Sequence, residues 1–242
     1  MNVIITSLPD SHIVEEVIRT SLKLLEKGKE GLVLIDTTTV DPVWSKGLAM
    51  ELKERGMEML DATLGGGSVM CSKREAPVMV GGKEETFRKC QDILVAIGKE
   101  VFYVGESGSG ALMKLIHNLV IGLNRMVLAE ALVLGKKAGL DLALVLEILK
   151  KSGAYSRVMD TKGPRMLSRD FLPPESKLAF HLKDVHLILD LAKRLNVPAI
   201  LSALHAQALA SEVAKGRGEW DNSSIFSFYE DLTRIENISP IK

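Results

Sequence analysis

Leu32-Val33-Leu34-Ile35-Asp36-Thr37-Thr38-Thr39-Val40-Asp41-Pro42 is the stretch that decides the fold. Residues 32–36 form an apolar run that is typical of a parallel strand buried on both faces. The three threonines end that strand. Asp41 and Pro42 then open a helix. Amides in the first helical turn have no acceptor within the helix, so proline, which has no amide hydrogen, is favoured there. A strand followed directly by a helix predicts an α/β unit.

The same alternation extends over the first hundred residues. A turn at residues 8–11 supplies an N-cap for the first helix, and glycines at 28, 31 and 56 end helices. Alternating strands and helices imply right-handed crossovers and a parallel sheet. The remaining expected strands are 3–7, 57–62, 78–80 and 101–104, and the expected helices are 13–25, 42–56 and 83–97.

The character of the chain changes after residue 105, where no strand pattern recurs. Residues 111–138 are apolar on nearly every side, which predicts a helix of about 40 Å that is buried all round. Further helices are expected at 141–151, 182–195 and 200–215. We therefore place a domain boundary at the Gly-Ser-Gly loop, with an α/β domain at 1–106 and an all-helical domain at 107–242.

Composition excludes several functional classes. The 242 residues are 46% hydrophobic, and 31 Lys plus Arg balance 31 Asp plus Glu. Zero net charge gives no field that would favour nucleic acid or anionic lipid, and the apolar fraction excludes general disorder. Cys71 and Cys90 are too few for a disulfide scaffold or a thiolate metal site. With no export signal and no uninterrupted apolar run of membrane-spanning length, we expect a cytoplasmic protein with reduced thiols.

Three loops follow the carboxyl ends of expected parallel strands, where ligands bind in such sheets: 8–10, 37–39 and 61–67. In the third loop, Gly65, Gly66 and Gly67 could let backbone amides approach a carboxylate, because no Cβ stands in the way. A flexible surface turn is the alternative.

Lys114 interrupts the apolar start of the long helix, with Asn118 four residues later on the same face. A lysine there could exchange a proton during hydride transfer, or could instead extend its ammonium to water. Lys183 and Asp184 form a second charge pair, for which an exposed ion pair is the alternative. His117 lies between Lys114 and Asn118 and either lines the same pocket or is merely packed. The five histidines show no metal-ligand spacing.

Taken in order, these segments resemble the β-hydroxyacid dehydrogenases, which include 3-hydroxyisobutyrate dehydrogenase and the tartronate semialdehyde and glyoxylate/succinic semialdehyde reductases. The resemblance runs from residue 3 to about 230 and is greatest to the tartronate semialdehyde and glyoxylate reductase branch. The residues that carry it are Leu8-Pro9-Asp10, Ile35 to Pro42, Asp61-Ala62 with Gly66-Gly67, Met79 to Gly82, Gly108-Ser109-Gly110 with Lys114 and Asn118, Ala129-Glu130-Ala131, Lys183-Asp184, and Asp221 to Ser224 with Phe228 to Leu232.

The resemblance implies a Rossmann-like sheet followed by a helical domain like that of 6-phosphogluconate dehydrogenase. It implies an oxidoreductase that uses NADP or NAD to interconvert a small β-hydroxyacid and its semialdehyde, in a homodimer or homotetramer without nucleic acid or membrane. Lys114 would be the acid/base and Asn118 would hold substrate. The other implied roles are substrate carboxylate binding by the amides of Gly66 and Gly67, contact with the nicotinamide by Leu8, Pro9 and Thr39, and cofactor contact by Lys183.

Two departures from the family pattern stand out. Gly65 takes the place of a serine that would bond the substrate. The first residues correspond to the family's fourth strand, so the sheet is expected to be partial, without the first strands and the GxGxxG turn that cradles pyrophosphate. The alternative function is therefore a catalytically silent, truncated chain that acts as a dimerising or regulatory subunit.

Overall fold

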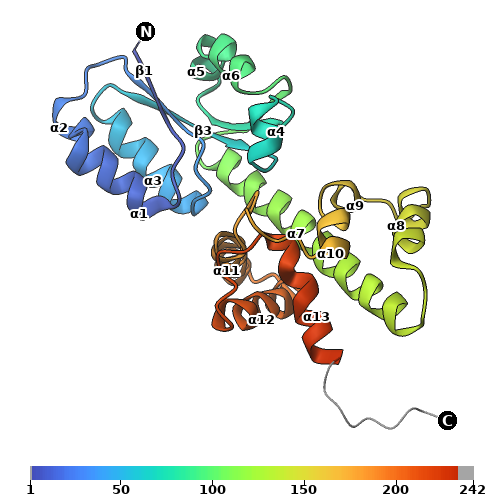
Figure 1. Ribbon diagram of the computed structural model, residues 1–242. Coiled ribbons are helices and arrows are strands. Elements are labelled where there is room, and N and C mark those ends of the chain that lie inside the picture. Colours follow the sequence, from blue (N-terminus) through green and yellow to red (C-terminus); the bar gives the residue numbers. More distant parts are fainter. Residues whose placement is uncertain (1, 234–242) are drawn as a thin grey trace. The chain divides into compact units, whose positions relative to one another are not determined.

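The computed structural model describes residues 2–233, which form two compact units divided between His117 and Asn118 (Figure 1). The first unit is built on a five-stranded sheet with the strands in sequence order. Its strands are β1 (Val3–Thr6), β2 (Val33–Asp36), β3 (Glu58–Leu64), β4 (Val78–Gly82) and β5 (Val101–Gly105). The predicted α/β domain with five strands is thereby confirmed.

The sheet is not parallel throughout, and in this respect the prediction is wrong. β1, β2 and β3 are parallel and β5 is parallel to β4, but β4 runs antiparallel to β3. Leu64 at the end of β3 lies opposite Val78 at the start of β4, so the chain re-enters the sheet at the edge where it left. For β4 to run parallel to β3, the connection would have to lead back along the full length of the strand. The five-residue helix α4 (Ser68–Ser72) is too short to make such a crossover.

Helices cover both faces of this sheet (Figure 1). Because side chains alternate along a strand, Leu34 packs with Val14 and Leu52 on one face, while Ile35 packs with Leu94 on the other. The expected helix at 13–25 is broken by a π-helical turn, and that at 83–97 divides at residue 90. The helices are α1 (Ser11–Glu16), η1 (Val17–Ser21), α2 (Leu24–Lys27), α3 (Pro42–Lys53), α5 (Glu84–Lys89) and α6 (Gln91–Ile97).

Both predicted helix starts are confirmed in atomic detail. The Asp10 carboxylate accepts a hydrogen bond from the amide of Ile13, and Asp41 accepts one from Val43 with Pro42 in the first turn. Such caps satisfy amides that have no partner within the helix. They also fix where each chain segment turns at the carboxyl edge of β1 and β2.

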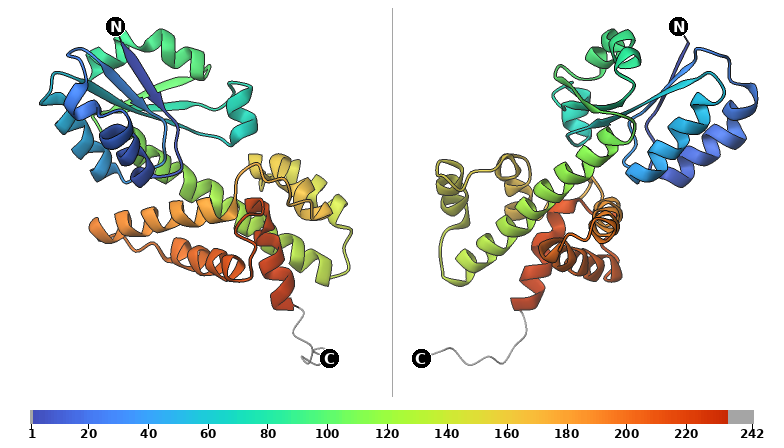
Figure 2. Two further views of the ribbon diagram at one scale, coloured as in Figure 1. Left: turned by 60° about the vertical axis from the view of Figure 1, so that its left-hand side comes forward. Right: turned by 180° about the vertical axis from the view of Figure 1, so that it is seen from behind.

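The second unit is helical throughout its described residues, as expected. α11 and α12 form a hairpin, and α13 packs beside them (Figure 2). Leu128 and Leu132 of the long helix α7 are buried with Met166, Leu178 and Phe226 in one core. The helices are α7 (Ser109–Lys137), α8 (Leu142–Lys150), α9 (Arg157–Thr161), α10 (Gly163–Ser168), α11 (Leu178–Arg194), α12 (Ile200–Ala214), η2 (Asn222–Ser224) and α13 (Ile225–Thr233).

α7 is not buried all round, contrary to the prediction. Val120, Val127 and Leu134, spaced by seven residues, are 52%, 65% and 71% exposed and form an apolar stripe along the helix. By length and composition α7 is also the one helix within residues 2–233 that could cross a membrane, although half of its most hydrophobic window is buried. A central core helix meets the same criteria, so this finding is weak evidence for a span.

Candidate active site

The carboxyl ends of β1 and β2 bring two of the predicted ligand loops together. Thr6 and Asp36 are paired in register, so the loops that follow them leave the sheet side by side. The amide of Leu8 donates to the Thr38 hydroxyl at 3.1 Å, which ties the first loop to the second. Pro9 is exposed, and Leu8 and Thr39 are partly buried. The three residues assigned to the nicotinamide therefore lie at one edge of the first unit.

Asp36 holds these loops in place, and the sequence analysis gave it no role. Its buried carboxylate accepts hydrogen bonds from the Thr6 hydroxyl at 2.8 Å and the Thr38 amide at 3.1 Å. Burial raises the pKa of the Asp36 carboxyl, although the bonds from Thr38 and Thr6 oppose that rise. Because Thr38 in turn binds Leu8, Asp36 positions both loops at once.

The glycine loop is the third element at this edge. It leads from β3 into α4, and a side chain on Gly66 would crowd Met70 and Ala76 at 3.0–3.1 Å, so the packing favours glycine there. A Cβ on Gly67 would meet nothing within 4 Å. The loop is thus packed at Gly66 and open at Gly67, which leaves room for a ligand beside its backbone.

Lys114 lies beside the glycine loop. It is 9% exposed, and its Nζ donates to the carbonyl oxygen of Leu64 at 2.5 Å, just before Gly65. The ammonium is therefore held at the end of β3 and does not extend into solvent, which was the alternative. An amine in this position can give a proton to an oxygen bound at the loop.

Asp61 fixes the start of α7 and so the position of Lys114. Its carboxylate accepts hydrogen bonds from the amides of Gly108 at 2.9 Å and Ala111 at 2.8 Å, and burial raises its pKa. The Thr63 hydroxyl donates to the carbonyl of Gly110 at 2.8 Å. The Gly-Ser-Gly loop is thus the point at which α7 is anchored to β3.

This anchoring predicts that Gly110→Ala destabilises the chain by about 2 kcal/mol, as overpacking does in dense cores. A Cβ on Gly110 would collide with the backbone carbonyls of Asp61 and Met79, which cannot move without breaking the sheet. Gly47→Ala in α3 is the matched control, because nothing lies within 4 Å of its Cβ. Thermal unfolding of both variants tests the prediction, and equal melting temperatures would contradict it.

Asn118 and Lys183 meet in the second unit. The Asn118 Nδ2 donates to Asp184 Oδ2 at 2.8 Å, and the Lys183 Nζ lies 3.1 Å from Asp184 Oδ1. The Asp184 side chain is 14% exposed and that of Lys183 is 30% exposed, so the pair is not the fully exposed ion pair that was the alternative. Asp184 is the residue that links the two predicted site residues, and the sequence analysis missed that role.

The first unit also contains a cavity that is separate from the predicted site residues. A cavity of about 440 Å³ in the first unit is lined by Lys46, Glu58, Lys83 and Tyr103, at the opposite end of β3 from the glycine loop. No predicted site residue lines it. Within residues 2–233, no three His, Cys, Asp or Glu side chains are grouped so as to hold a metal ion.

Comparison with known proteins decides the family. A model of the "NAD binding domain of 6-phosphogluconate dehydrogenase" matches residues 1–105, and a model of the "NAD-binding of NADP-dependent 3-hydroxyisobutyrate dehydrogenase" matches residues 108–229. The 2-(hydroxymethyl)glutarate dehydrogenase of Eubacterium barkeri is 35% identical over 235 residues, which cover 97% of this chain and 78% of that protein. The chain belongs to the 3-hydroxyisobutyrate dehydrogenase family.

Further members and a solved structure agree. The 2-hydroxy-3-oxopropionate reductase of Escherichia coli is 30% identical over 95% of this chain and 78% of that protein. Human mitochondrial 3-hydroxyisobutyrate dehydrogenase is 33% identical over 94% of this chain and 70% of that protein. The crystal structure of 3-hydroxyisobutyrate dehydrogenase from Salmonella typhimurium superposes with a TM-score of 0.83 at 25% identity and covers 93% of this chain and 78% of its own. The predicted resemblance is confirmed, and the chain is an oxidoreductase of an NAD(P)-dependent family.

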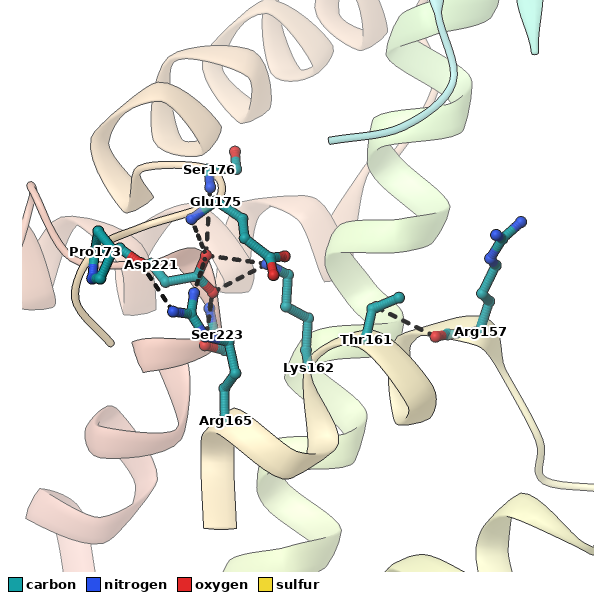
Figure 3. Close-up of polar contacts among 9 residues, drawn as sticks. All are labelled: Arg157, Thr161, Lys162, Arg165, Pro173, Glu175, Ser176, Asp221 and Ser223. Carbon is teal, nitrogen blue, oxygen red and sulfur yellow. Dashed lines mark hydrogen bonds and ion pairs between the residues drawn. The ribbon is translucent and has the colours of Figure 1, made fainter. Parts of the chain in front are cut away.

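The Asp221–Ser224 segment, which carries part of the resemblance to the 3-hydroxyisobutyrate dehydrogenase family, organises the second unit (Figure 3). The fully buried Asp221 carboxylate accepts hydrogen bonds from Lys162 Nζ at 3.0 and 3.1 Å and from the Ser223 hydroxyl at 2.7 Å. Arg165 Nη1 lies 3.1 Å from it, and the amides of Glu175 and Ser176 also donate to it. Burial alone would raise the pKa of Asp221, but Ser223 and Lys162 hold it at about 2.

Proposed function

We propose that this chain interconverts a small β-hydroxyacid and its semialdehyde, with Lys114 as the acid/base. The observation that carries the proposal is the buried Lys114 ammonium at the carbonyl of Leu64, beside the glycine loop. The names of the related proteins describe small hydroxyacids and an oxopropionate, which fit a compact carboxylate-bearing substrate.

The residues present fit the nicotinamide half of NAD(P). Leu8, Pro9 and Thr39 lie at the carboxyl edge of the sheet, where dinucleotides bind in this fold class. The hydrogen bonds of Asp36 with Thr6 and Thr38 hold that edge together. Residues 2–233 contain no GxGxxG turn of the kind that cradles pyrophosphate, so we assign no residue to that part of the cofactor.

In this proposal, bound NAD(P)H supplies the hydride. Lys114 Nζ gives its proton to the carbonyl oxygen of the semialdehyde during reduction and takes it back from the hydroxyl during oxidation. The amides of Gly66 and Gly67 bind the substrate carboxylate. Asn118 holds the substrate, with its own amide fixed by Asp184 at 2.8 Å, and Lys183 contacts the cofactor.

The test is a titration of the purified chain with NADPH and NADH, in which binding is measured by the quenching of the fluorescence of Trp44 and Trp220. A screen of glyoxylate and small semialdehydes follows, with Lys114→Ala as the control. Saturable binding and turnover that depends on Lys114 are expected. A chain that binds neither cofactor and turns over none of these compounds would favour the alternative, a silent subunit.

The apolar stripe of α7 supports a further part of the proposal, self-association through this helix. Stripes of exposed apolar side chains are typical of surfaces that a partner covers. We expect Val127→Lys to dissociate a homodimer or homotetramer into smaller oligomers or monomers. A lysine buried in an apolar contact would lose its hydration, which weakens the association. Analytical ultracentrifugation measures this, with the exposed Lys151→Ala as the control. A wild-type chain that sediments as a monomer would contradict the prediction.

A further inference from the structure

The cavity of about 440 Å³ at the start of β3 takes no part in the proposed reaction. Its volume lies within the range of about 300–1,000 Å³ that is usual for small-molecule sites. Two buried side chains, Ala49 of α3 and Met59 of β3, line it together with the more exposed Met50 and Tyr103. The cavity therefore offers an apolar surface to the aliphatic part of a small organic ligand.

The side of the cavity that α3 forms is basic. Lys46 and Lys53 line it, and their spacing of seven residues places both on one face of the helix. In the described part of the chain, neither lysine forms an ion pair with a carboxylate. Lys53 lies at the last residue of α3, where its long side chain can follow a ligand in the cavity.

Carboxylates surround Tyr103 on the other side of the cavity. Glu84 begins α5 and Glu106 follows β5, and both line the cavity. Burial raises the pKa of the Tyr103 hydroxyl, and the negative charges of Glu84 and Glu106 add to that rise. Glu84 accepts a hydrogen bond from Arg88 at 2.6 Å, whereas Glu106 has no cationic partner within residues 2–233. Glu106 is thus the carboxylate that is left for a ligand.

The sheet keeps these opposite charges apart. α3 packs on one face of the sheet through Leu48, and α5 packs on the other through Phe87. The remaining charged residues of the lining pair with each other, since Lys83 Nζ lies 3.7 Å from Glu58 Oε1. Three lysines and three glutamates line the cavity, so the lining has no net charge. Complementarity of charge therefore favours a ligand that carries both signs over a simple anion or cation.

We propose that this cavity binds an α-amino acid with an aliphatic side chain. Lys53 binds its carboxylate, Glu106 accepts hydrogen bonds from its ammonium beside the ring of Tyr103, and the aliphatic chain packs against Met50 and Met59. An ammonium is attracted to the face of an aromatic ring, and methionine side chains adapt to the shape of an apolar ligand. The inference goes beyond the proposed function, because the cavity lies at the opposite end of β3 from the glycine loop.

L-norleucine, hexanoate and pentylamine are the probes, because they share an unbranched aliphatic chain and differ in their charged groups. Isothermal titration calorimetry of the 242-residue chain should show saturable binding of L-norleucine. Hexanoate lacks the ammonium and pentylamine lacks the carboxylate. Each should bind about 10-fold more weakly than L-norleucine, the effect of losing one hydrogen bond to a charged group.

Two exposed residues allow the charges of the cavity to be removed one at a time. Lys53→Met should weaken the binding of L-norleucine about 10-fold and leave that of pentylamine unchanged. Glu106→Gln should weaken the binding of L-norleucine about 10-fold and leave that of hexanoate unchanged. Glu54→Gln is the matched control, because Glu54 is the exposed neighbour of Lys53 and does not line the cavity. It should bind L-norleucine like the wild type, and so should Lys114→Ala.

The inference is overturned if the wild type shows no saturable binding of L-norleucine, as expected if water alone solvates the charges of the cavity. It is also overturned if Lys53→Met and Glu106→Gln bind L-norleucine like the wild type, or if either variant weakens all three probes equally. Thermal unfolding shows whether the variants fold, and both should melt like the wild type because the substituted side chains are exposed. A chain that binds L-norleucine but neither NADPH nor NADH would contradict the proposed function alone.

Discussion

Lys114→Ala is expected to lower the turnover number about 1,000-fold, within the range that general acid–base catalysis contributes. The variant loses the ammonium that lies beside the glycine loop, at 2.5 Å from the Leu64 carbonyl. The affinity for cofactor should change little, because Lys114 lies at the end of β3 and not in the loops tied together by Asp36 and Thr38.

Steady-state kinetics with a small semialdehyde and NADPH measure this effect. Lys114→Arg separates the effect of charge from that of proton transfer, because arginine keeps a cation at the glycine loop but cannot release a proton near neutral pH. Both variants should lose turnover, whereas Lys46→Ala, an exposed lysine of α3, should not. A Lys114→Ala protein that keeps more than a tenth of the wild-type turnover number would assign the proton transfer to another group.

Asp221→Ala is expected to destabilise the second unit by about 3–5 kcal/mol, the cost of removing one partner from a buried charge cluster. The variant leaves Lys162, whose side chain is 9% exposed, and Arg165, at 16%, facing each other without the carboxylate between them. It also removes the acceptor for the amides of Glu175 and Ser176. Urea unfolding at pH 7 measures the loss, and Asp170→Ala, on an exposed carboxylate, is the control.

The same carboxylate predicts how stability depends on pH. The pKa of Asp221 is about 2 in the folded chain against an ordinary value of 3.8, so its stabilisation is present above pH 4 and is lost as the pH falls toward 2. The difference corresponds to about 2 kcal/mol. Urea unfolding of the wild type and Asp221→Asn at pH 6, 4 and 2.5 checks the sign, because the two proteins should converge in stability as the pH falls. A difference that does not change with pH would contradict it.

Much of the fold could be predicted from local patterns. Apolar runs such as residues 32–36 and caps such as Asp10 and Asp41 act within a few residues, so the sequence shows them directly. The direction of β4 could not be predicted in this way, because it depends on where the chain after Gly67 re-enters the sheet. The exposure of Val127 and Leu134 could not be predicted either, since an apolar residue looks the same whether a core or a partner covers it.

The residues of the candidate site also fall into those that could be predicted from local patterns and those that could not. Gly66, Gly67, Lys114, Asn118 and Lys183 were found because they stand in motifs, and the structure places Lys114 at the glycine loop and Asn118 near Lys183. The residues that position them were missed because their partners lie far away in the sequence. Asp36 binds Thr6 from 30 residues away, Asp61 binds the amide of Ala111 from 50, and Asp184 binds Asn118 from 66. Such contacts leave no local pattern.

The continuity of α7 across residues 117 and 118 has a geometric consequence. Lys114 belongs to the first unit and Asn118 to the second, yet both are carried by one uninterrupted helix of 29 residues. Their backbones are therefore held about 6 Å apart along the helix axis by helical hydrogen bonds, whatever angle the two units adopt. Insertion of a single residue between them would rotate Asn118 by about 100° relative to Lys114. The spacing between the backbones of Lys114 and Asn118 is thus set by α7 alone.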